Sequence, residues 1–519
     1  MAVWAAGPAG RSGVVIGTLD PRWKKAWPEA KSLGILAIAW KFRQRQTRFR
    51  VKRTATRAAT RQVLPATTRR LALTAHTESL VPSQGRNTAA VSGPRPLNGP
   101  KQLLAASVGN AVEWFDWYIY SILAIYFSTQ FFPADAESSL VPLLGTMAVF
   151  AVGFFARPLG GLLIGYLADR FGRKRILVLT VLGMGAGSLM IAFSPTYAQI
   201  GVFAPLILVV ARLVQGLSAG GEYAASSALL VESAPTGKRG FYSSFFYISA
   251  TSANLLAIGI AALLTQLLPA EDMRSWGWRI PFVVGAVAAL IALWVRSHAA
   301  ETLHEDQIAA ASASRGTAER VRLFSFLKHH PKSVFFVFGM TASSAIVFYI
   351  WTGFLPTYAN IAVGFDVTQG LSASLISLTW FLVLQPVMGA LSDRFGRKPF
   401  LIAFGVFFTV ATVPLLGSLN DSFASFLAVQ LLGVTFIAAA TSIVQAVFSE
   451  LFPRTLRSAG IGFPYAVSVA LFGGTAPYVA TWMASQGNIG GFAWYVAGIS
   501  LVSLIIMCFV PETYKKELD

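Results

Sequence analysis

The sequence predicts an all-α membrane protein with twelve transmembrane helices in two six-helix pseudo-repeats. Three observations predict this fold class: an apolar composition, twelve long apolar segments, and loop motifs that recur in both halves. Of the 519 residues, 55% are hydrophobic and only 13% are charged, and the mean hydropathy is +0.59. Because an ordinary soluble domain contains about 25% charged residues, this composition indicates a polytopic membrane protein.

A helix that crosses a bilayer needs about 20 mostly apolar residues. Segments of this kind occur at 103–131, 140–168, 176–194, 202–231, 240–268, 279–297, 333–361, 371–391, 400–417, 423–450, 458–484 and 491–511. The longest polar interruption, 298–332, divides them six and six. We therefore expect a six-helix bundle over 101–297, a cytoplasmic loop over 298–332 and a second bundle over 333–519.

Positive charge is concentrated before the first expected span. The chain has a formal net charge of +19, of which residues 1–100 contribute 18 Lys and Arg minus three acids, or +15. A charge confined to a tail gives no support for a nucleic-acid partner. We interpret residues 1–100 as a disordered, solvated arm, or as an upstream extension of the reading frame. A polybasic lipid-binding segment and a targeting peptide are the alternatives.

The loop charges predict the orientation. With a cytoplasmic N-terminus, the inner loops and the C-tail from the second span onward hold 19 Lys and Arg, and the outer loops hold Arg274 and Arg279. By the positive-inside rule, both termini are expected in the cytoplasm and the protein in the inner membrane. The inner residues are Arg170, Arg173, Lys174, Arg175, Lys238, Arg239, Arg296, Arg315, Arg320, Arg322, Lys328, Lys332, Arg394, Arg397, Lys398, Arg454, Arg457, Lys515 and Lys516.

Two loop motifs recur at corresponding places in the two halves. The first motif reads Gly165-Tyr-Leu-Ala-Asp169-Arg170-Phe-Gly172-Arg173-Lys174 and Gly389-Ala-Leu-Ser-Asp393-Arg394-Phe-Gly396-Arg397-Lys398. The second reads Glu232-Ser-Ala-Pro235-Thr-Gly-Lys-Arg239 and Glu450-Leu-Phe-Pro453-Arg-Thr-Leu-Arg457. Parallel six-span repeats are one of the architectures of transporters that work by alternating access.

These loops place carboxylates and guanidinium groups at the cytoplasmic ends of helices. Charge-assisted bonds there can hold the inner face closed and exchange partners when it opens. If the loops only fixed the topology, the repeated acids would have no role. We therefore expect a cytoplasmic gate formed by Asp169, Arg170, Arg173, Glu232, Arg239, Asp393, Arg394, Arg397, Glu450 and Arg457.

On these motifs, residues 103–511 resemble the major facilitator superfamily, and within it the metabolite:proton symporter family. The further segments that carry the resemblance are Glu113-Trp-Phe-Asp116-Trp-Tyr-Ile-Tyr120, Arg157-Pro-Leu-Gly-Gly161, Arg212-Leu-Val-Gln215-Gly216, Trp276-Gly-Trp-Arg-Ile-Pro-Phe282 and Gly460-Ile-Gly-Phe-Pro-Tyr465. The basic tail has no counterpart in this resemblance.

The resemblance implies the major facilitator fold and secondary active import of a small organic acid, alpha-ketoglutarate or a related dicarboxylate, by proton symport. Shikimate, citrate, and proline or betaine are alternative substrates because the same family carries them. A proton antiport exporter is a weaker alternative, since residues 240–268 lack the proline common in the fifth span of such exporters. The expected partners are the substrate, protons and the lipid bilayer, and we expect a monomer without a cofactor.

Other function classes are disfavoured. The sequence contains no phosphate-binding loop of the ATPase type, so ATP-driven transport is not expected. The single cysteine, Cys508, excludes an intrachain disulfide framework and a multi-thiolate metal site. No histidine lies in an expected span, which argues against a membrane-embedded histidine relay. We therefore predict neither an enzyme nor a metal site.

Four charged residues lie near the middle of expected spans: Glu113, Asp116, Arg157 and Arg212. Such residues usually face a cavity or a partner because a charge inside the bilayer is costly. The resemblance to sugar:proton symporters implies that Asp116 and Arg212 couple transport to protons, with Glu113 as a further candidate. Arg157 and Arg212 are expected to bind the substrate carboxylates, because a guanidinium fits a carboxylate at two points. Fixed ion pairs between helices are the alternative.

Neutral side chains complete the expected substrate site. Tyr120 shares a helical face with Glu113 and Asp116, at spacings of three and seven residues. The other candidates are Gln215, Tyr349, Gln385 and Tyr465. For each of them, a packing or interfacial role is the alternative.

Overall fold

The computed structural model describes residues 99–133, 140–171, 173–220, 222–235, 237–301, 325–453 and 456–514. All of them belong to one compact unit, Val91–Asp519. Most of the expected basic tail and most of the expected central loop, including 302–324, lie outside the described residues. The division into two six-helix bundles stays a prediction, and we use "N-terminal half" for 99–301 and "C-terminal half" for 325–514.

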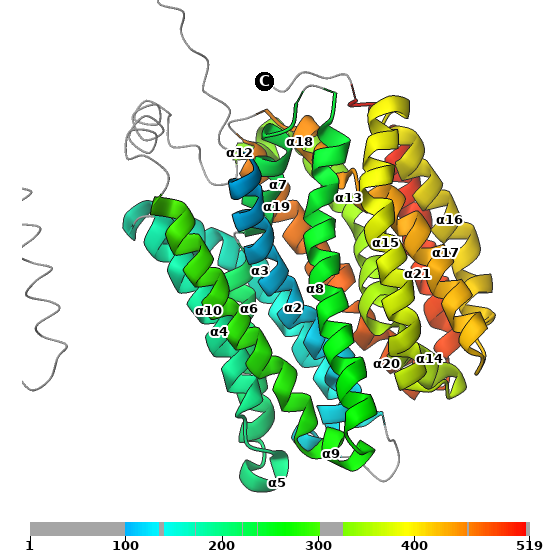
Figure 1. Cartoon of the computed structure of the whole chain (residues 1–519). Coiled ribbons are helices and arrows are strands. Elements are labelled where there is room, and N and C mark those ends of the chain that lie inside the picture. Colours follow the sequence, from blue (N-terminus) through cyan, green and yellow to red (C-terminus); the bar gives the residue numbers. More distant parts are fainter. Residues whose placement is uncertain are drawn as a thin grey trace, which may run out of the picture. The chain divides into compact units, whose positions relative to one another are not determined.

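Every apolar segment expected in the N-terminal half forms helical structure (Figure 1). The fourth one forms two helices, one that ends at Ala219 and one that begins at Glu222, which hydropathy alone did not indicate. The elements are α2 (Gly99–Phe131), α3 (Val141–Phe171), α4 (Arg173–Ala192), α5 (Tyr197–Ile200), α6 (Phe203–Ala219), α7 (Glu222–Glu232), α8 (Arg239–Leu267), α9 (Ala270–Ser275), η3 (Gly277–Arg279) and α10 (Ile280–Glu301).

The C-terminal half repeats this pattern, with two helices interrupted by short π-helical segments, η4 and η5. Such segments occur frequently at functional sites. The elements are α12 (Ser325–His329), α13 (Pro331–Tyr349), η4 (Ile350–Phe354), α14 (Leu355–Val363), α15 (Val367–Phe395), α16 (Lys398–Gly417), α17 (Phe423–Thr441), α18 (Val444–Leu451), α19 (Arg457–Ser468), η5 (Val469–Gly474), α20 (Ala476–Ser485) and α21 (Ile489–Phe509).

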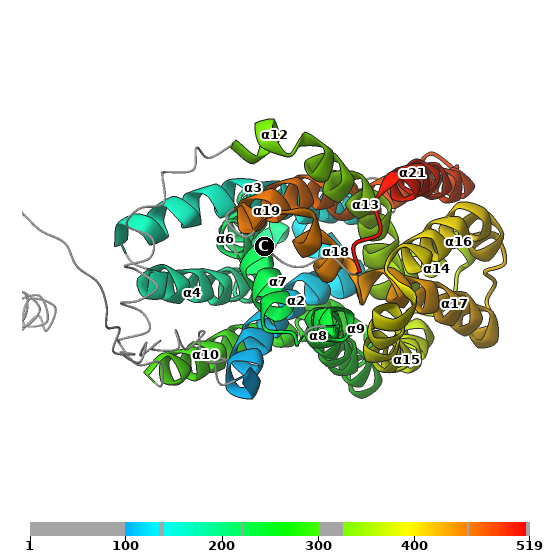
Figure 2. The same cartoon turned by 90° about the horizontal axis from the view of Figure 1, so that it is seen from above.

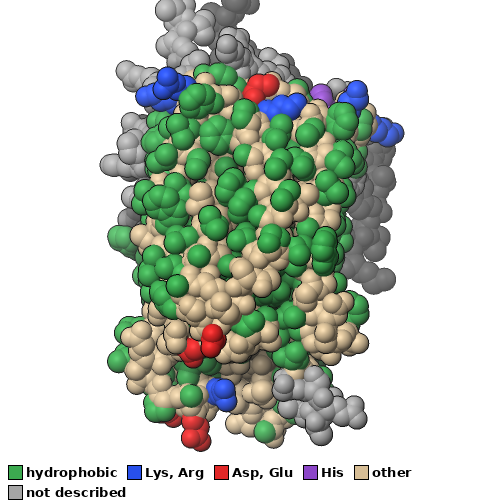
Figure 3. All heavy atoms as spheres, turned by 90° about the vertical axis from the view of Figure 1, so that its right-hand side faces the viewer, with side chains coloured by type: hydrophobic (Ala, Val, Ile, Leu, Met, Phe, Trp, Pro, Cys, Tyr) green, Lys and Arg blue, Asp and Glu red, His purple; other side chains and the backbone are tan. Residues whose placement is uncertain are grey.

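The outer surface is apolar, as expected of helices in lipid. Among the described residues, nine helices are long and apolar enough to cross a membrane, and Val178–Ala192 and Phe203–Ala219 are shorter apolar helices. Large hydrophobic side chains such as Phe193, Trp494 and Phe509 are more than two-thirds exposed. Figure 3 shows one face on which charged side chains gather toward the two ends and hydrophobic ones cover the belt between them.

The two halves pack along the middle of the unit. Seen from above, α2, α3, α7 and α8 lie toward the C-terminal half, where α13, α15, α18 and α19 face them (Figure 2). Helix α8 packs along α15, and α3 packs against α19, η5 and α20. The surfaces of these helices that face the other half form the setting of the candidate site.

Within the N-terminal half, α3 and α6 are in contact through their backbones. A Cβ atom on Gly216 would overlap the carbonyl oxygen of Gly153, and one on Gly220 would overlap the carbonyl oxygen of Arg157. Small residues allow such close approach where lipid provides no hydrophobic force between helices. The contact brings the buried charge on α3 close to the buried charge on α6.

Replacing Gly216 with alanine is therefore expected to destabilise the fold. The added methyl group meets the backbone of α3, so we expect a loss of about 1–3 kcal/mol, seen as a lower melting temperature in detergent. Gly498→Ala is the matched control, because nothing lies within 4 Å of a Cβ at that position on α21. Equal melting temperatures for the two variants would contradict the predicted α3–α6 contact.

Candidate functional site

The four charges expected in the membrane lie inside the N-terminal half. Glu113 and Asp116 are on α2, Arg157 is on α3 and Arg212 is on α6. Asp116 and Arg212 are fully buried, and Glu113 and Arg157 are 7% and 6% exposed. The structure thus collects two carboxyl and two guanidinium groups from three helices.

Arg157 and Glu113 form an ion pair. The Nη2 atom of Arg157 lies 3.6 Å from Oε1 of Glu113, and both side chains are 8% exposed. The Arg157 guanidinium also lies 4.1 Å from the ring centroid of Trp117 and 4.5 Å from that of Phe154. These rings stabilise the buried cation through their negative faces.

Arg212 lies beside Asp116, but the structure records no ion pair between their side chains. Nη2 of Arg212 instead donates to the backbone carbonyl oxygen of Asp116 at 3.4 Å. The guanidinium lies 3.8 Å from the ring centroid of Tyr120. On α10, a Cβ atom at Gly285 would lie 2.5 Å from Oδ1 of Asp116, so this carboxyl points toward α10.

Buried polar atoms without a hydrogen-bond partner are concentrated around these charges. Among the described side chains they include both carboxyl oxygens of Asp116, Nε and Nη2 of Arg157, and Nε and Nη1 of Arg212. The hydroxyl groups of Tyr118 and Tyr349 are also buried without a hydrogen-bond partner among the described residues. Most buried polar groups in proteins are hydrogen-bonded, so this concentration makes these side chains candidates for a functional role.

A narrow space between the two halves opens onto the Arg157–Glu113 pair. We call it the inter-half crevice, and its walls come from α2, α3, α6, α7, α8, α19 and η5. The ring of Tyr465 stacks on the ring of Tyr223 across the two halves, with 3.4 Å between centroids. The lining residues are Asn110, Glu113, Trp114, Arg157, Ala219, Gly220, Tyr223, Phe246, Gly462, Tyr465, Ala466 and Val469.

The structure brings two of the five neutral candidates to this crevice. Tyr465 lines it, and Tyr349 stacks on the crevice residue Trp114, with 6.0 Å between ring centroids. Each of the other three is bonded within its own half, Tyr120 and Gln215 in the N-terminal half and Gln385 in the C-terminal half. Tyr120 donates to the carbonyl oxygen of Thr146, Gln215 donates to Ser188 Oγ, and Gln385 donates to Thr441 Oγ1.

Sequence reasoning missed several polar side chains at the inter-half crevice and near it. Asn110 donates to Ser249 Oγ at 2.7 Å and thereby ties α2 to α8. Asn254 on α8 donates to the carbonyl oxygen of Thr352, in the π-helical segment η4 of the other half, at 2.7 Å. Uncharged amides inside apolar spans were the available signal for both residues.

At one end of the unit, charged residues of the two halves bind one another. Nη1 of Arg457 lies 2.6 Å from Oε1 of Glu232, and this pair joins α19 to α7. Oε1 of Glu450 lies 3.6 Å from Arg239 and 3.6 Å from Arg397. We call this the charged end, and its residues are Glu232, Arg239, Asp393, Arg397, Glu450, Arg457, Glu512 and Thr513.

Asp393 holds the start of α8. Its two carboxyl oxygens accept hydrogen bonds from the backbone N–H groups of Gly240 and Phe241, at 2.8 and 2.9 Å. A carboxylate is stabilised at a helix N-terminus by the free N–H groups and the helix dipole. Arg397 donates to Asp393 at 2.8 Å from the other side.

The remaining expected gate residues divide into two groups. The side chains of Asp169, Arg170 and Arg173 lie outside the described part of the structure. Arg394 is exposed, with its guanidinium 5.5 Å from the ring centroid of Phe395. Arg394 therefore lies apart from the buried ion pairs that join the halves.

The chain after α21 also belongs to the charged end, which the sequence motifs did not indicate. Thr513 Oγ1 donates to Oε2 of Glu450 at 2.6 Å, and Glu512 accepts from the backbone N–H groups of Arg397 and Lys398. Partial burial raises the pKa of Glu512, but these bonds and those from the N–H groups of Thr513 and Tyr514 outweigh it, so the pKa lies below its usual range.

The chain is similar to known transporters over most of its length. Residues 102–519 match the family model described as "Sugar (and other) transporter". The chain is 38% identical over 406 residues to the alpha-ketoglutarate permease of Escherichia coli K12, a match that covers 78% of this chain and 92% of that protein. It is 30% identical over 426 residues to the proline/betaine transporter of Salmonella typhimurium LT2, covering 80% and 84%.

A further relative is the inner membrane metabolite transport protein YhjE of Escherichia coli K12, 35% identical over 434 residues that cover 82% of this chain and 97% of that protein. Among solved structures, the crystal structure of a D-xylose-proton symporter matches with a TM-score of 0.62 and 18% identity, covering 81% of this chain and 99% of that one. The predicted fold class is thereby confirmed.

Glu232→Gln is expected to weaken closure of the charged end. Arg457 is 1% exposed, so loss of its carboxylate partner leaves a buried cation, which we expect to cost about 1–3 kcal/mol of the closed state. The measurement is the rate of maleimide labelling of a cysteine placed at the crevice residue Ala466 in a Cys508→Ser background. Labelling should be faster in Glu232→Gln than in the protein with Glu232. Glu271→Gln, in α9, is the control, and an unchanged labelling rate in Glu232→Gln would refute the role of the pair.

The bonds of Glu512 predict an acid-sensitive C-terminal contact. Because the folded-state pKa is lowered, the contact is fully present above the unfolded-state pKa of about 4.3 and is lost as pH falls through the folded-state value. Hydrogen exchange at the amides of Arg397 and Lys398 should therefore accelerate only below about pH 4. In Glu512→Gln the exchange should be fast already at pH 6, and slow exchange there would contradict the assignment.

Proposed function

Because the chain belongs to the sugar (and other) transporter family of the major facilitator superfamily, we propose that it imports a small organic acid by proton symport. Members of this family are multi-pass membrane transporters and not enzymes. Alternating access moves the substrate between the two halves. The proposal rests above all on one observation, the buried group of two guanidinium and two carboxyl side chains, of which Arg157 and Glu113 line the inter-half crevice.

The preferred substrate is alpha-ketoglutarate or a related dicarboxylate. Two guanidinium groups suit two carboxylates, since each provides a planar pair of donors. Arg157 is the guanidinium residue that lines the crevice, and its Nε atom has no hydrogen-bond partner among the described residues. The similarity to a relative named alpha-ketoglutarate permease supports the same substrate class.

A zwitterion such as proline or betaine is the second candidate. The crevice is bordered by aromatic rings of both halves, those of Trp114, Tyr223, Tyr349 and Tyr465. Aromatic faces bind quaternary ammonium groups through cation–π contacts. The similarity to proline/betaine transporters supports this alternative, in which Arg157 binds the single carboxylate.

Asp116 is the proposed proton carrier. Among the described residues, no donor meets hydrogen-bond geometry at its carboxyl oxygens, and burying an ionised carboxylate without donors costs far more than burying the neutral acid. A proton on Asp116 removes the negative charge beside Arg212. The guanidinium of Arg212 then adds its positive charge to that of Arg157, so that the proton and the substrate anion load together.

The charged end is proposed to face the cytoplasm. The positive-inside rule supports this orientation, because Arg239, Arg394, Arg397 and Arg457 all lie at that end. The ion pairs between the halves then form the cytoplasmic gate, which is closed in this structure. Opening requires Arg457, Glu450 and Asp393 to exchange their partners in the other half for water.

Uptake by purified protein in liposomes tests the function directly. With an acidic outside, radiolabelled alpha-ketoglutarate should accumulate inside, and a protonophore should abolish the accumulation. Competition by unlabelled citrate, shikimate, proline and betaine ranks the alternative substrates. Accumulation of none of these compounds under a proton gradient would refute proton symport.

Asp116→Asn is expected to remove one proton from the transport cycle. The amide cannot carry a proton, so the accumulation ratio driven by a gradient of one pH unit should fall about tenfold below that of wild type. Exchange of internal for external substrate should persist. Asp421→Asn, at an exposed position, is the control, and pH-driven accumulation by Asp116→Asn at the wild-type ratio would contradict the assignment.

Arg157→Lys is expected to weaken substrate binding. Lysine keeps the charge but loses the two-point fit, so the KM for a dicarboxylate should rise by about tenfold to a hundredfold, matching 1.5–3 kcal/mol for a charged hydrogen bond. Initial rates of uptake measure this. Arg394→Lys, at an exposed position, is the control, and an unchanged KM in Arg157→Lys would remove Arg157 from the substrate site.

A further inference from the structure

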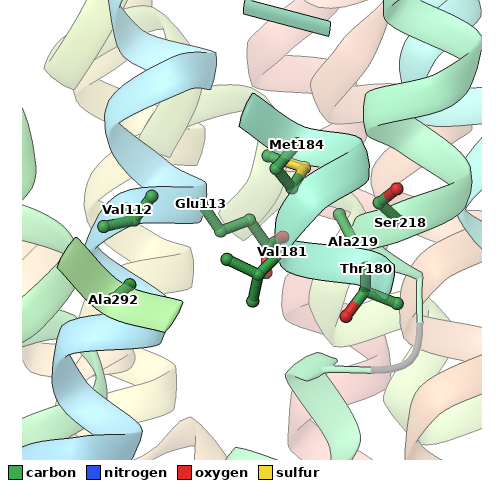
Figure 4. A pocket seen from close by; sticks show the side chains of 8 residues that line it. All are labelled: Val112, Glu113, Thr180, Val181, Met184, Ser218, Ala219 and Ala292. Carbon is green, nitrogen blue, oxygen red and sulfur yellow. The ribbon is translucent and has the colours of Figure 1, made fainter. Parts of the chain in front are cut away.

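A second narrow space lies inside the N-terminal half, next to Glu113. It is enclosed by α2, α4, α6 and α10 alone, without any residue of the C-terminal half. Figure 4 shows the Glu113 side chain extending from α2 into this space, toward Val181 and Ala219. We call it the inner crevice, and its polar lining besides Glu113 consists of the hydroxyl-bearing residues Thr180 and Ser218.

Glu113 lies in the wall that separates the two spaces. It lines both the inner crevice and the inter-half crevice, and its ion-pair partner Arg157 lines only the inter-half crevice. On the side of the inter-half crevice, a substrate carboxylate can therefore compete with Glu113 for Arg157. On the side of the inner crevice, the Glu113 carboxyl group can meet water. Neither Asp116 nor Arg212 lines either space.

The inner crevice lies on the charged-end side of the buried ions. Thr180 is seven residues from the start of α4, and Ala292 is nine residues from the end of α10, which places them about 10 and 14 Å along the helix axes from that end. Asp116 is three residues farther from the charged end than Glu113, or about 4.5 Å. The inner crevice thus extends from Glu113 toward the charged end without passing between the halves.

The groups that face Glu113 set its charge balance. Arg157 approaches it from α3, Tyr349 from α13, and Tyr223 and Tyr465 line the same crevice from α7 and α19. The described residues of α4, α6 and α10 that line the inner crevice carry no charge. Arg157 is the cation that the structure pairs with Glu113, and protonation of Glu113 weakens this pair.

We propose that Glu113 carries a second proton, which it exchanges with water through the inner crevice while the substrate moves through the inter-half crevice. This inference rests on the proposed function. A proton from water on the acidic side binds the Glu113 carboxylate and frees Arg157, which then binds a carboxylate of the substrate. After the substrate leaves, Glu113 returns its proton to water through the inner crevice and pairs with Arg157 again.

The proposal predicts the net charge that moves with each substrate molecule, and this charge can be measured. Glu113 and Asp116 together carry two protons, so a dianion crosses without net charge. With only one carrier, a dianion and one proton move one negative charge, and a membrane potential of 59 mV changes the accumulation ratio about tenfold per charge. Electrical neutrality therefore distinguishes two carriers from one.

The test measures alpha-ketoglutarate accumulation in liposomes at fixed pH gradient while potassium and valinomycin set the membrane potential. Wild-type accumulation should not depend on the potential. Glu113→Gln should accumulate about tenfold more at 59 mV inside positive than at zero potential. A wild-type ratio that changes tenfold per 59 mV, or Glu113→Gln accumulation that is independent of potential, would overturn the proposal.

A second variant tests the route and does not alter any charge. Ala292→Val narrows the inner crevice and should slow pH-driven uptake severalfold, while the stoichiometry stays at two protons. Ala288→Val, half-buried on the same helix, is the matched control. Equal rates for the two variants would overturn the route. If wild type accumulates no dicarboxylate at all, the proposed function fails, whereas accumulation with one proton refutes only this inference.

Discussion

The fold depends on keeping four ionisable side chains inside an apolar helix bundle. A charge in the bilayer interior is costly unless it is compensated locally. The structure compensates Arg157 with Glu113 and the ring of Trp117, and it compensates Arg212 with the ring of Tyr120 and a backbone carbonyl oxygen. These arrangements need α2, α3 and α6 at fixed spacing, which the glycine contacts between α3 and α6 provide.

The buried ions and the charged end are connected through α7. This helix begins two residues after Gly220, whose neighbour across the contact is the backbone of Arg157. Tyr223 on α7 forms part of the inter-half crevice and accepts a hydrogen bond from Gln445 of α18 at 3.0 Å. Glu232 is the last residue of α7, and Glu450 is one residue before the end of α18. The two helices that meet at the crevice therefore also carry carboxylates of the charged end.

Hydropathy predicted the helices well because the length of an apolar run reflects the thickness of the bilayer. It did not predict the separation of α6 from α7 or the π-helical segments, since these depend on backbone hydrogen bonds and not on apolarity. The same limit applies to the site. Rarity inside the spans was enough to identify the charged residues, whereas the positions of Tyr120 and Gln385 depend on how each helix is rotated about its axis.

The bond between Asp393 and the start of α8 has an evolutionary consequence. Its donors are main-chain amides of Gly240 and Phe241, so substitution of Phe241 by any residue but proline leaves its donor in place. Gly240 is constrained by packing instead, because a Cβ atom there would overlap Ser392 and lie 2.5 Å from the carbonyl oxygen of Gly389. We therefore expect position 241 to vary without a matching change at Asp393, since its donor does not depend on the side chain.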